Sequence, residues 1–261
     1  MKMGLMRGEI VPRAELRSLG FEAVQLFFNG GQEDDGDPTP EEIDATLKEG
    51  DTVLAAMTLH VDLVGSQGCV QGDVDRAVRC VEKTAALDGR FGDNEKPLLV
   101  WHPSGYPQDP ADDGVVFDGL CEALTAVCSK AEQVGVNLAV EITRDGSIGS
   151  AETFLHVADR VNSTALKVCI DAANFVPDRT PLQRAVRMLG PHIAIAHGKD
   201  SSFDESGLAI HYGPTGSGKL DHASYVGYLQ EFARAPYFVL EYYTSREELL
   251  RARDIIVAAL R

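Results

Sequence analysis

Short apolar runs rich in β-branched residues alternate with longer amphipathic segments along the chain. Some of the later runs are continuously apolar, such as Leu98-Leu-Val-Trp101, and this is typical of strands that are buried on both faces. The pattern predicts eight strands, which are residues 3–6, 23–28, 53–64, 97–101, 137–142, 165–170, 192–196 and 237–241.

Apolar positions spaced by three and four residues predict helices between these strands, at residues 73–87, 115–134, 150–161, 181–189 and 245–260. Ser150 is a predicted N-cap, and Ser245 with Glu248 forms a predicted capping box. Strands that alternate with helices favour an α/β fold, a closed (βα)8 TIM barrel. An open doubly wound sheet is the alternative, but it would need a Gly-rich turn after the first strand, which is absent.

The length of 261 residues suits one barrel, and no linker divides the chain, so we expect a single domain over residues 1–261. Two long connections interrupt the regular pattern. Residues 29–40 (NGGQEDDGDPTP) predict an acidic, turn-rich loop that is long enough to be a flap over a site. Residues 201–220 predict a second long loop, between the seventh strand and its helix.

The net charge of −16 disfavours nucleic acid as a partner, because phosphates would be repelled and the 24 basic residues are scattered. No apolar run is long enough to span a membrane, and there is no secretory h-region. The five cysteines form no C-x-x-C pair. We therefore expect a soluble, reduced, cytoplasmic protein, and nothing in the chain marks an interface that would settle whether it is a homo-oligomer.

Most of the predicted strands from the third onward carry a charged or imidazole side chain at or near their end. These residues are His60, His102, Glu141, Asp171, His197 and Glu241. Because a barrel places its chemistry at the C-terminal ends of its strands, the last four are predicted to converge. Three carboxylates at close range repel one another unless a cation is present. A ligand set of three oxygens and one nitrogen suits Mn²⁺ or Mg²⁺ and also admits Co²⁺ or Zn²⁺.

The stretch Gly213-Pro-Thr-Gly-Ser-Gly-Lys219 fits most of the phosphate-binding pattern of nucleotide-binding P-loops. Leu220 stands where that pattern needs a Ser or Thr for Mg²⁺, and the helix that follows is predicted to begin only near Asp221. We therefore expect a glycine-rich turn at the rim of the barrel, and not a nucleotide site.

The chain resembles the xylose isomerase-like barrel superfamily, in its branch of sugar phosphate isomerases and epimerases. The resemblance is carried by "WHPSG", "LAVEI", "VCIDAANF", "IAHGKD", "GPTGSGKLDHASYVGYL" and "FVLEYY". It implies that Glu141, Asp171, His197 and Glu241 bind one divalent metal ion. It also implies that Glu141 and Glu241 are the catalytic acid and base.

This resemblance implies a sugar or keto-polyol substrate that loses and regains a proton beside its carbonyl through a metal-stabilised enediolate. Return of the proton to the opposite face gives epimerisation, and transfer to the neighbouring carbon gives isomerisation. The candidate substrate-binding residues are His60, His102, Asn174, Lys199 and His211. Whether the substrate is phosphorylated stays open at this point.

Three alternatives remain. A keto-polyol dehydratase would use the same parts and then expel a hydroxyl group. A non-catalytic sugar-binding barrel would keep the site without turnover. An apurinic endonuclease is disfavoured, because Asn174 and Ala209 stand where that branch has metal ligands, and because the chain is acidic.

Overall fold

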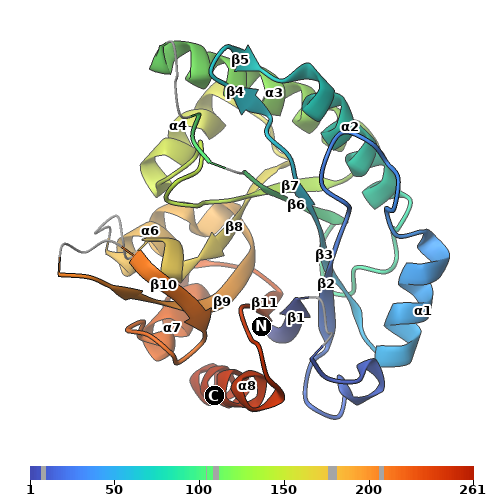
Figure 1. The fold of residues 1–261 in the computed structure, drawn as a ribbon, viewed down its shortest axis with the longest axis vertical. Coiled ribbons are helices and arrows are strands. Elements are labelled where there is room, and N and C mark those ends of the chain that lie inside the picture. Colours follow the sequence, from blue (N-terminus) through green and yellow to red (C-terminus); the bar gives the residue numbers. More distant parts are fainter. Residues whose placement is uncertain (7–9, 104, 108–111, 176–180, 206–208) are drawn as a thin grey trace.

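Eight parallel strands close into a barrel in the computed structural model, which describes the whole chain except residues 7–9, 104, 108–111, 176–180 and 206–208 (Figure 1). The hydrogen-bonded order is β1, β2, β3, β6, β7, β8, β9, β11, and β11 pairs again with β1. This closure confirms the predicted barrel and rules out the open sheet. The barrel strands are β1 (Lys2–Met6), β2 (Ala23–Phe27), β3 (Val53–His60), β6 (Leu98–His102), β7 (Asn137–Glu141), β8 (Leu166–Asp171), β9 (Ile193–Phe203) and β11 (Tyr237–Leu240).

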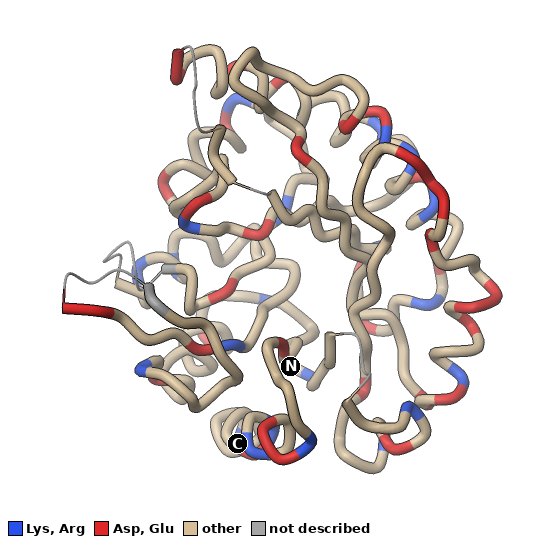
Figure 2. Tube along the Cα trace, in the orientation of Figure 1, with Lys and Arg blue, Asp and Glu red and all other residues tan. Residues whose placement is uncertain are grey.

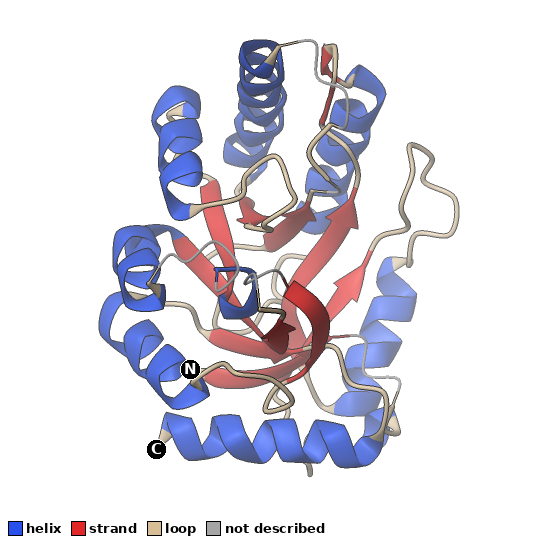
Figure 3. Cartoon of the chain, turned by 60° about the vertical axis from the view of Figure 1, so that its left-hand side comes forward, coloured by secondary structure: helices blue, strands red, loops and turns tan. Residues whose placement is uncertain are grey.

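Helices surround the barrel on its outer side (Figure 3). They are α1 (Pro40–Gly50), α2 (Gln71–Ala85), α3 (Asp113–Val134), α4 (Ala151–Val161), α5 (Ala172–Phe175), α6 (Leu182–Leu189), α7 (His222–Phe232) and α8 (Arg246–Leu260), with short 3-10 turns at Arg13–Glu15 and Gly190–His192. The predicted N-caps are present, since Ser150 accepts a hydrogen bond from the backbone N–H of Thr153, and Ser245 accepts one from that of Glu248. The predicted capping box at Ser245 is only half formed, because the carboxylate of Glu248 accepts from the backbone N–H of Thr244 at 2.8 Å and not from that of Ser245.

The structure corrects the predicted pattern in three places. The run 53–64 is not one strand: β3 ends at His60, and β4 (Val64–Gly65) pairs with β5 (Gly68–Cys69). Helix α1 was not predicted, and it begins with a capping box between Thr39 and Glu42. The connection 201–220 is largely a β-hairpin, because β9 continues to Phe203 and pairs with β10 (Ala209–Pro214) in antiparallel orientation.

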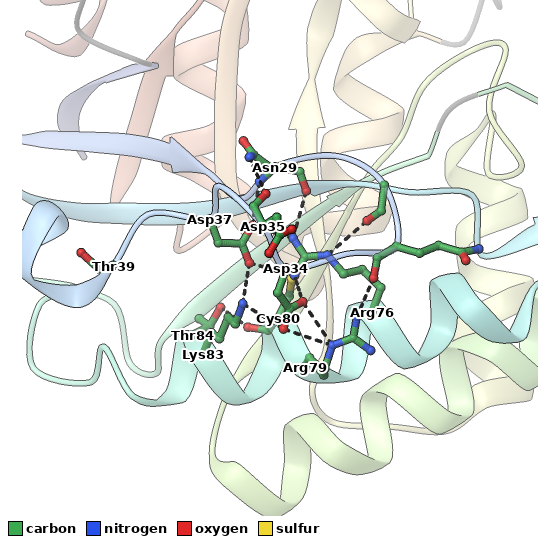
Figure 4. A network of polar contacts seen from close by, with 12 residues as sticks. Asn29, Asp34, Asp35, Asp37, Thr39, Arg76, Arg79, Cys80, Lys83 and Thr84 are labelled. Atoms are coloured by element: carbon green, nitrogen blue, oxygen red, sulfur yellow. Dashed lines mark hydrogen bonds and ion pairs between the residues drawn. The ribbon is translucent and has the colours of Figure 1, made fainter.

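The acidic loop 29–40, which the sequence suggested as a flap, is fastened to helix α2 (Figure 4). The fully buried Arg76 donates to the carboxylate of Asp37 with both terminal nitrogens, at 2.6 and 2.8 Å, and to Asp34 at 2.6 Å. Its other N–H groups donate to two backbone carbonyls of the loop, at 3.0 and 3.2 Å. A guanidinium whose hydrogen bonds all end on one loop fixes the position of that loop.

The glycine-rich stretch before Leu220 wraps around a carboxylate of the chain itself, that of the buried Asp200. The backbone N–H groups of Gly216 and Leu220 each donate to this carboxylate at 3.1 Å, and His222 Nε2 lies 3.1 Å from it. A Cβ at Gly218 would collide with the same carboxylate, so this position needs glycine. Burial by itself raises the pKa of Asp200, but the hydrogen bonds from His222 and the backbone outweigh it and lower the pKa to about 2.

The excess of acidic residues is spread over the outer helices and loops, with Lys and Arg between them (Figure 2). No helix in the part of the chain that the structure describes is long and apolar enough to cross a membrane.

We predict that Arg76→Met lowers the free energy of unfolding by about 3 kcal/mol, because it leaves the buried carboxylate of Asp37 with Lys83 as its remaining cation. Urea denaturation measures this change. The matched control is Arg79→Met on the same helix, whose half-exposed side chain should contribute less than about 1 kcal/mol. Equal losses for the two variants would contradict the assignment of Arg76 as the main anchor.

A second prediction concerns Asp200→Asn. The lowered pKa means that Asp200 contributes stability above the ordinary carboxyl pKa near 4, and that this contribution is lost as the pH falls towards 2. The variant should be less stable than the native protein by about 2 kcal/mol at pH 6, and the difference should shrink between about pH 4 and pH 2. Urea denaturation across this range, with the exposed Asp159→Asn as control, measures the difference. If the stability difference between Asp200→Asn and the native protein did not change with pH, the ionised Asp200 carboxylate would not be its source.

Candidate functional site

A cavity of about 620 Å³ opens at the C-terminal ends of the barrel strands. Its polar lining includes Glu141, Lys199 and Glu241, and part of its wall is aromatic or apolar, with Phe27 and Tyr242 among the lining residues. A concave site with a few convergent polar groups at this end of a barrel is where an active site is expected.

The structure brings together the four residues that the sequence singled out as metal ligands. Glu141 and Asp171 are the last residues of β7 and β8, His197 lies within β9, and Glu241 directly follows β11. All four are buried, with exposed fractions of 3, 0, 0 and 8% in that order. One oxygen from each of the three carboxylates lies within 4.8 Å of the others.

Lys199 supplies positive charge to this cluster. Its ammonium nitrogen lies 2.6 Å from Asp171 Oδ2, 3.1 Å from Glu241 Oε1 and 3.9 Å from Glu141 Oε1. It also lies 5.2 Å from the ring centroids of Tyr212 and Tyr242. A cation in contact with three anions offsets their mutual repulsion, so this residue is part of the site and not of a solvated loop.

His197 contacts the carboxylates with one ring nitrogen and the barrel interior with the other. Its Nδ1 lies 3.5 Å from Glu141 Oε2 and 3.8 Å from Glu241 Oε1, and it has no hydrogen-bond partner among the described residues. Its Nε2 lies 3.0 Å from Gln25 Oε1 and 3.3 Å from Cys169 Sγ. The nitrogen that faces the carboxylates is therefore the one that is free to bind a ligand.

Burial and charge move the pKa values of this cluster in different directions. Burial raises the pKa of Asp171 to about 7, and the charges of Glu241 and Glu141 add to this effect against the opposing ammonium of Lys199. Burial also acts to raise the pKa of Glu141, but the positive charges of His197, Lys199 and His102 outweigh it and lower this pKa. Neighbouring carboxyl groups whose pKa values are shifted in opposite directions are common at functional sites.

The donor set fits a divalent cation. Three carboxylates and one imidazole are suitable ligands for Mn²⁺ or Mg²⁺, and the unpartnered, buried Nδ1 of His197 points towards two of the carboxylates. A bound ion would also reduce the repulsion within the cluster, the function that Lys199 performs in this structure.

The candidate substrate-binding residues differ in their surroundings. His60 and His102 line the cavity, and their rings are stacked with centroids 4.6 Å apart. Asn174 does not line it; the Asn174 amide donates a hydrogen bond of 2.9 Å to the backbone carbonyl of Ile142, the residue after Glu141. This bond holds the end of the strand that delivers Glu141.

His211 lies on β10 and is exposed to solvent, and it is not among the described residues that line the cavity. The pairing of β10 with β9 puts it opposite Ser202, well past His197 on that strand.

Sequence reasoning missed two residues that contact the cluster. Gln25, in the middle of β2, is fully buried and bonded to His197 and Thr58. Cys169 is also fully buried, and its sulfur lies 3.3 Å from His197 Nε2. The signal for Gln25 was available, since a single polar residue inside the apolar run Ala-Val-Gln-Leu-Phe needs a buried partner.

The comparisons with known proteins agree with this architecture. A solved structure of D-psicose 3-epimerase with D-tagatose, from Clostridium cellulolyticum H10, is 14% identical, covers 100% of both chains and has a TM-score of 0.74. The probable 3-DHS dehydratase AsbF of Bacillus anthracis is 13% identical over 100% of both chains, with a TM-score of 0.74. The 3-keto-D-glucoside 4-epimerase YcjR of E. coli is 14% identical over 99% of this chain and 98% of its own, with a TM-score of 0.73.

No match was found among the curated proteins. At these identities the structural similarities establish the fold alone. The family model for the xylose isomerase-like TIM barrel, however, matches residues 13–260, nearly the whole chain. The chain therefore belongs to the xylose isomerase-like TIM barrel family.

Proposed function

We propose that this chain is a divalent-metal-dependent sugar epimerase or isomerase that moves a proton at the carbon next to a carbonyl. The observation that carries the proposal is the placement of two glutamates. Glu141 and Glu241 both line the cavity, whereas the fully buried Asp171 beside them does not. Two carboxylates that reach the substrate space are placed for proton transfer, whereas the one behind them does not reach the substrate and is placed to bind an ion.

The two glutamates approach the cavity from different parts of the barrel. Glu141 ends β7 and Glu241 follows β11, and β8 and β9 lie between these strands in the sheet. In the proposed reaction, Glu241 removes a proton from one face of the substrate and Glu141 returns it from the other. Return to the same carbon inverts it, and return to the neighbouring carbon gives the aldose–ketose isomer.

Glu141, Asp171, His197 and Glu241 are the residues that would hold the metal ion. When bound, such an ion supplies Lewis acidity, which stabilises the negative charge that develops on the substrate carbonyl oxygen. Lys199 is within reach of the same region and would donate a hydrogen bond to a substrate oxygen. His60 and His102, which also line the cavity, would bind substrate hydroxyl groups.

Similarity to sugar epimerases supports this reaction class, since the solved structures of similar fold include D-psicose 3-epimerase and 3-keto-D-glucoside 4-epimerase. We propose a sugar or keto-polyol as the substrate. Lys199 is the only Lys or Arg among the described residues that line the cavity, and this favours an unphosphorylated substrate.

A keto-polyol dehydratase is the second candidate, because the imidazole of His102 lies beside a carboxylate in the cavity and can donate a proton. His102 Nε2 is 3.9 Å from Glu141 Oε1, and a leaving hydroxyl group must receive a proton. The probable dehydratase AsbF has a similar fold. Analysis of the reaction products by NMR distinguishes the two functions, since only the dehydratase releases water and forms a new double bond.

We predict that Glu241→Gln reduces exchange of the substrate α-proton with solvent by about 10²- to 10⁴-fold, because the amide cannot accept the proton. The assay incubates a panel of ketoses and keto-polyols with Mn²⁺ in D₂O and follows deuterium uptake by NMR. Glu247→Gln, an exposed position on α8, is the matched control and should exchange like the native protein. Unchanged exchange in Glu241→Gln would remove this residue from the acid–base role.

We also predict that a chelator lowers the thermal unfolding temperature and that added Mn²⁺ restores it. An ion present at 100 times its dissociation constant stabilises the folded state by about 2.7 kcal/mol. Asp171→Asn should lose most of this response, whereas Asp118→Asn, an exposed position on α3, should keep it. An equal Mn²⁺ response in both variants would argue against the proposed ligand set.

A further inference from the structure

We infer that Gln25 is a positioning residue that fixes the tautomer of His197 and thereby turns the lone pair of Nδ1 towards the carboxylate cluster. This inference rests on the proposed metal centre and concerns a residue on the far side of His197 from it. Gln25 comes from β2, a strand that supplies none of the four proposed ligands.

Gln25 is a polar residue buried in the barrel interior. Its exposed fraction is 0%, and a buried amide that leaves its hydrogen-bonding groups unpaired is costly. Both ends of the amide are paired: Gln25 Nε2 donates to Thr58 Oγ1 at 2.8 Å, and Oε1 lies 3.0 Å from His197 Nε2. The amide thus bridges β3 and β9 across the interior of the barrel.

The chemistry of an amide oxygen then decides the protonation of the ring. An amide oxygen only accepts, so the contact at 3.0 Å requires a hydrogen on His197 Nε2. In the neutral ring, which is the form that binds a metal ion, the other nitrogen, Nδ1, then carries the lone pair. That nitrogen faces Glu141 and Glu241 at 3.5 and 3.8 Å, distances too long for good hydrogen bonds.

A lone pair that points at two carboxylates is repelled by them unless a cation lies between. The arrangement is therefore unfavourable for a purely structural histidine and favourable for one that binds a metal ion. Partners that hold the distal N–H of a metal-binding histidine typically change metal affinity by 10- to 100-fold when they are removed.

The reverse orientation of the Gln25 amide would place the ring proton of His197 on the other nitrogen. If Gln25 Nε2 donated to His197 Nε2, with Thr58 donating to Gln25 Oε1, the ring proton would sit on Nδ1. His197 would then point a hydrogen at the carboxylates and would be a poor ligand. The two arrangements differ in which ring nitrogen carries the proton, and this is measurable.

The test combines two readouts on the native protein and two variants. In metal-free protein, a ¹⁵N–¹H spectrum identifies the protonated ring nitrogen through the coupling of Nε2 to Hδ2. We expect a protected His197 Nε2–H resonance in the native protein, its retention in Gln25→Glu, and its loss in Gln25→Leu. Titration with Mn²⁺ should give 10- to 100-fold weaker binding for Gln25→Leu than for the native protein.

The results distinguish the two orientations of the Gln25 amide. Native-like Mn²⁺ affinity in Gln25→Leu, or a native ring that carries a proton on Nδ1 and none on Nε2, would overturn the inference. If the native protein showed the Nε2–H resonance and bound no Mn²⁺, the proposed metal centre would fail while the hydrogen bond stood. Should Gln25→Leu not fold, Thr58→Val removes the far end of the same bridge, and we expect it to weaken Mn²⁺ binding by a smaller factor. Unchanged binding in that variant, with a normal unfolding curve, would also count against the inference.

Discussion

Mutual repulsion among three buried carboxylates is the constraint on which the rest of the site depends. Glu141, Asp171 and Glu241 lie too close together to be ionised without compensation. In this structure the ammonium of Lys199 provides part of that compensation, but burial and the charges of the two glutamates still raise the pKa of Asp171 to about 7. A divalent cation bound between them would allow all three carboxylates to be ionised at the same time.

The barrel creates this crowding through its strand register. Glu141 pairs with Cys169, two residues before Asp171, and Asp171 pairs with His197. The backbone N–H of Glu241 bonds to the carbonyl of Gly198, so that this side chain ends at the level of Lys199. Parallel strands in this register bring residues that are far apart in the chain into one volume, and the closed sheet keeps them there.

The sequence predicted the barrel and the four polar residues that follow apolar runs, because both follow from local pattern, although β9 continues past His197 to Phe203. It did not predict the contact of Gln25 with His197, because the two residues are 172 positions apart. The hairpin of β9 and β10 was also missed, since the end of β9 from Lys199 to Ser202 is polar and carries no apolar strand pattern; pairing with β10 holds it. The acidic loop 29–40 was read correctly as a loop, but its attachment depends on Arg76 on a later helix.

The carboxylate of Asp200 explains why the glycine-rich stretch looks like a nucleotide-binding loop. Backbone N–H groups in a tight, glycine-rich turn form a general receptor for negative charge, and the receptor does not distinguish a phosphate from a carboxylate. Here the chain fills that receptor with its own side chain during folding, so the stretch is a self-liganded anion site. Motif searches that read only the loop therefore overlook its occupant, which lies outside the motif and ahead of it in the sequence.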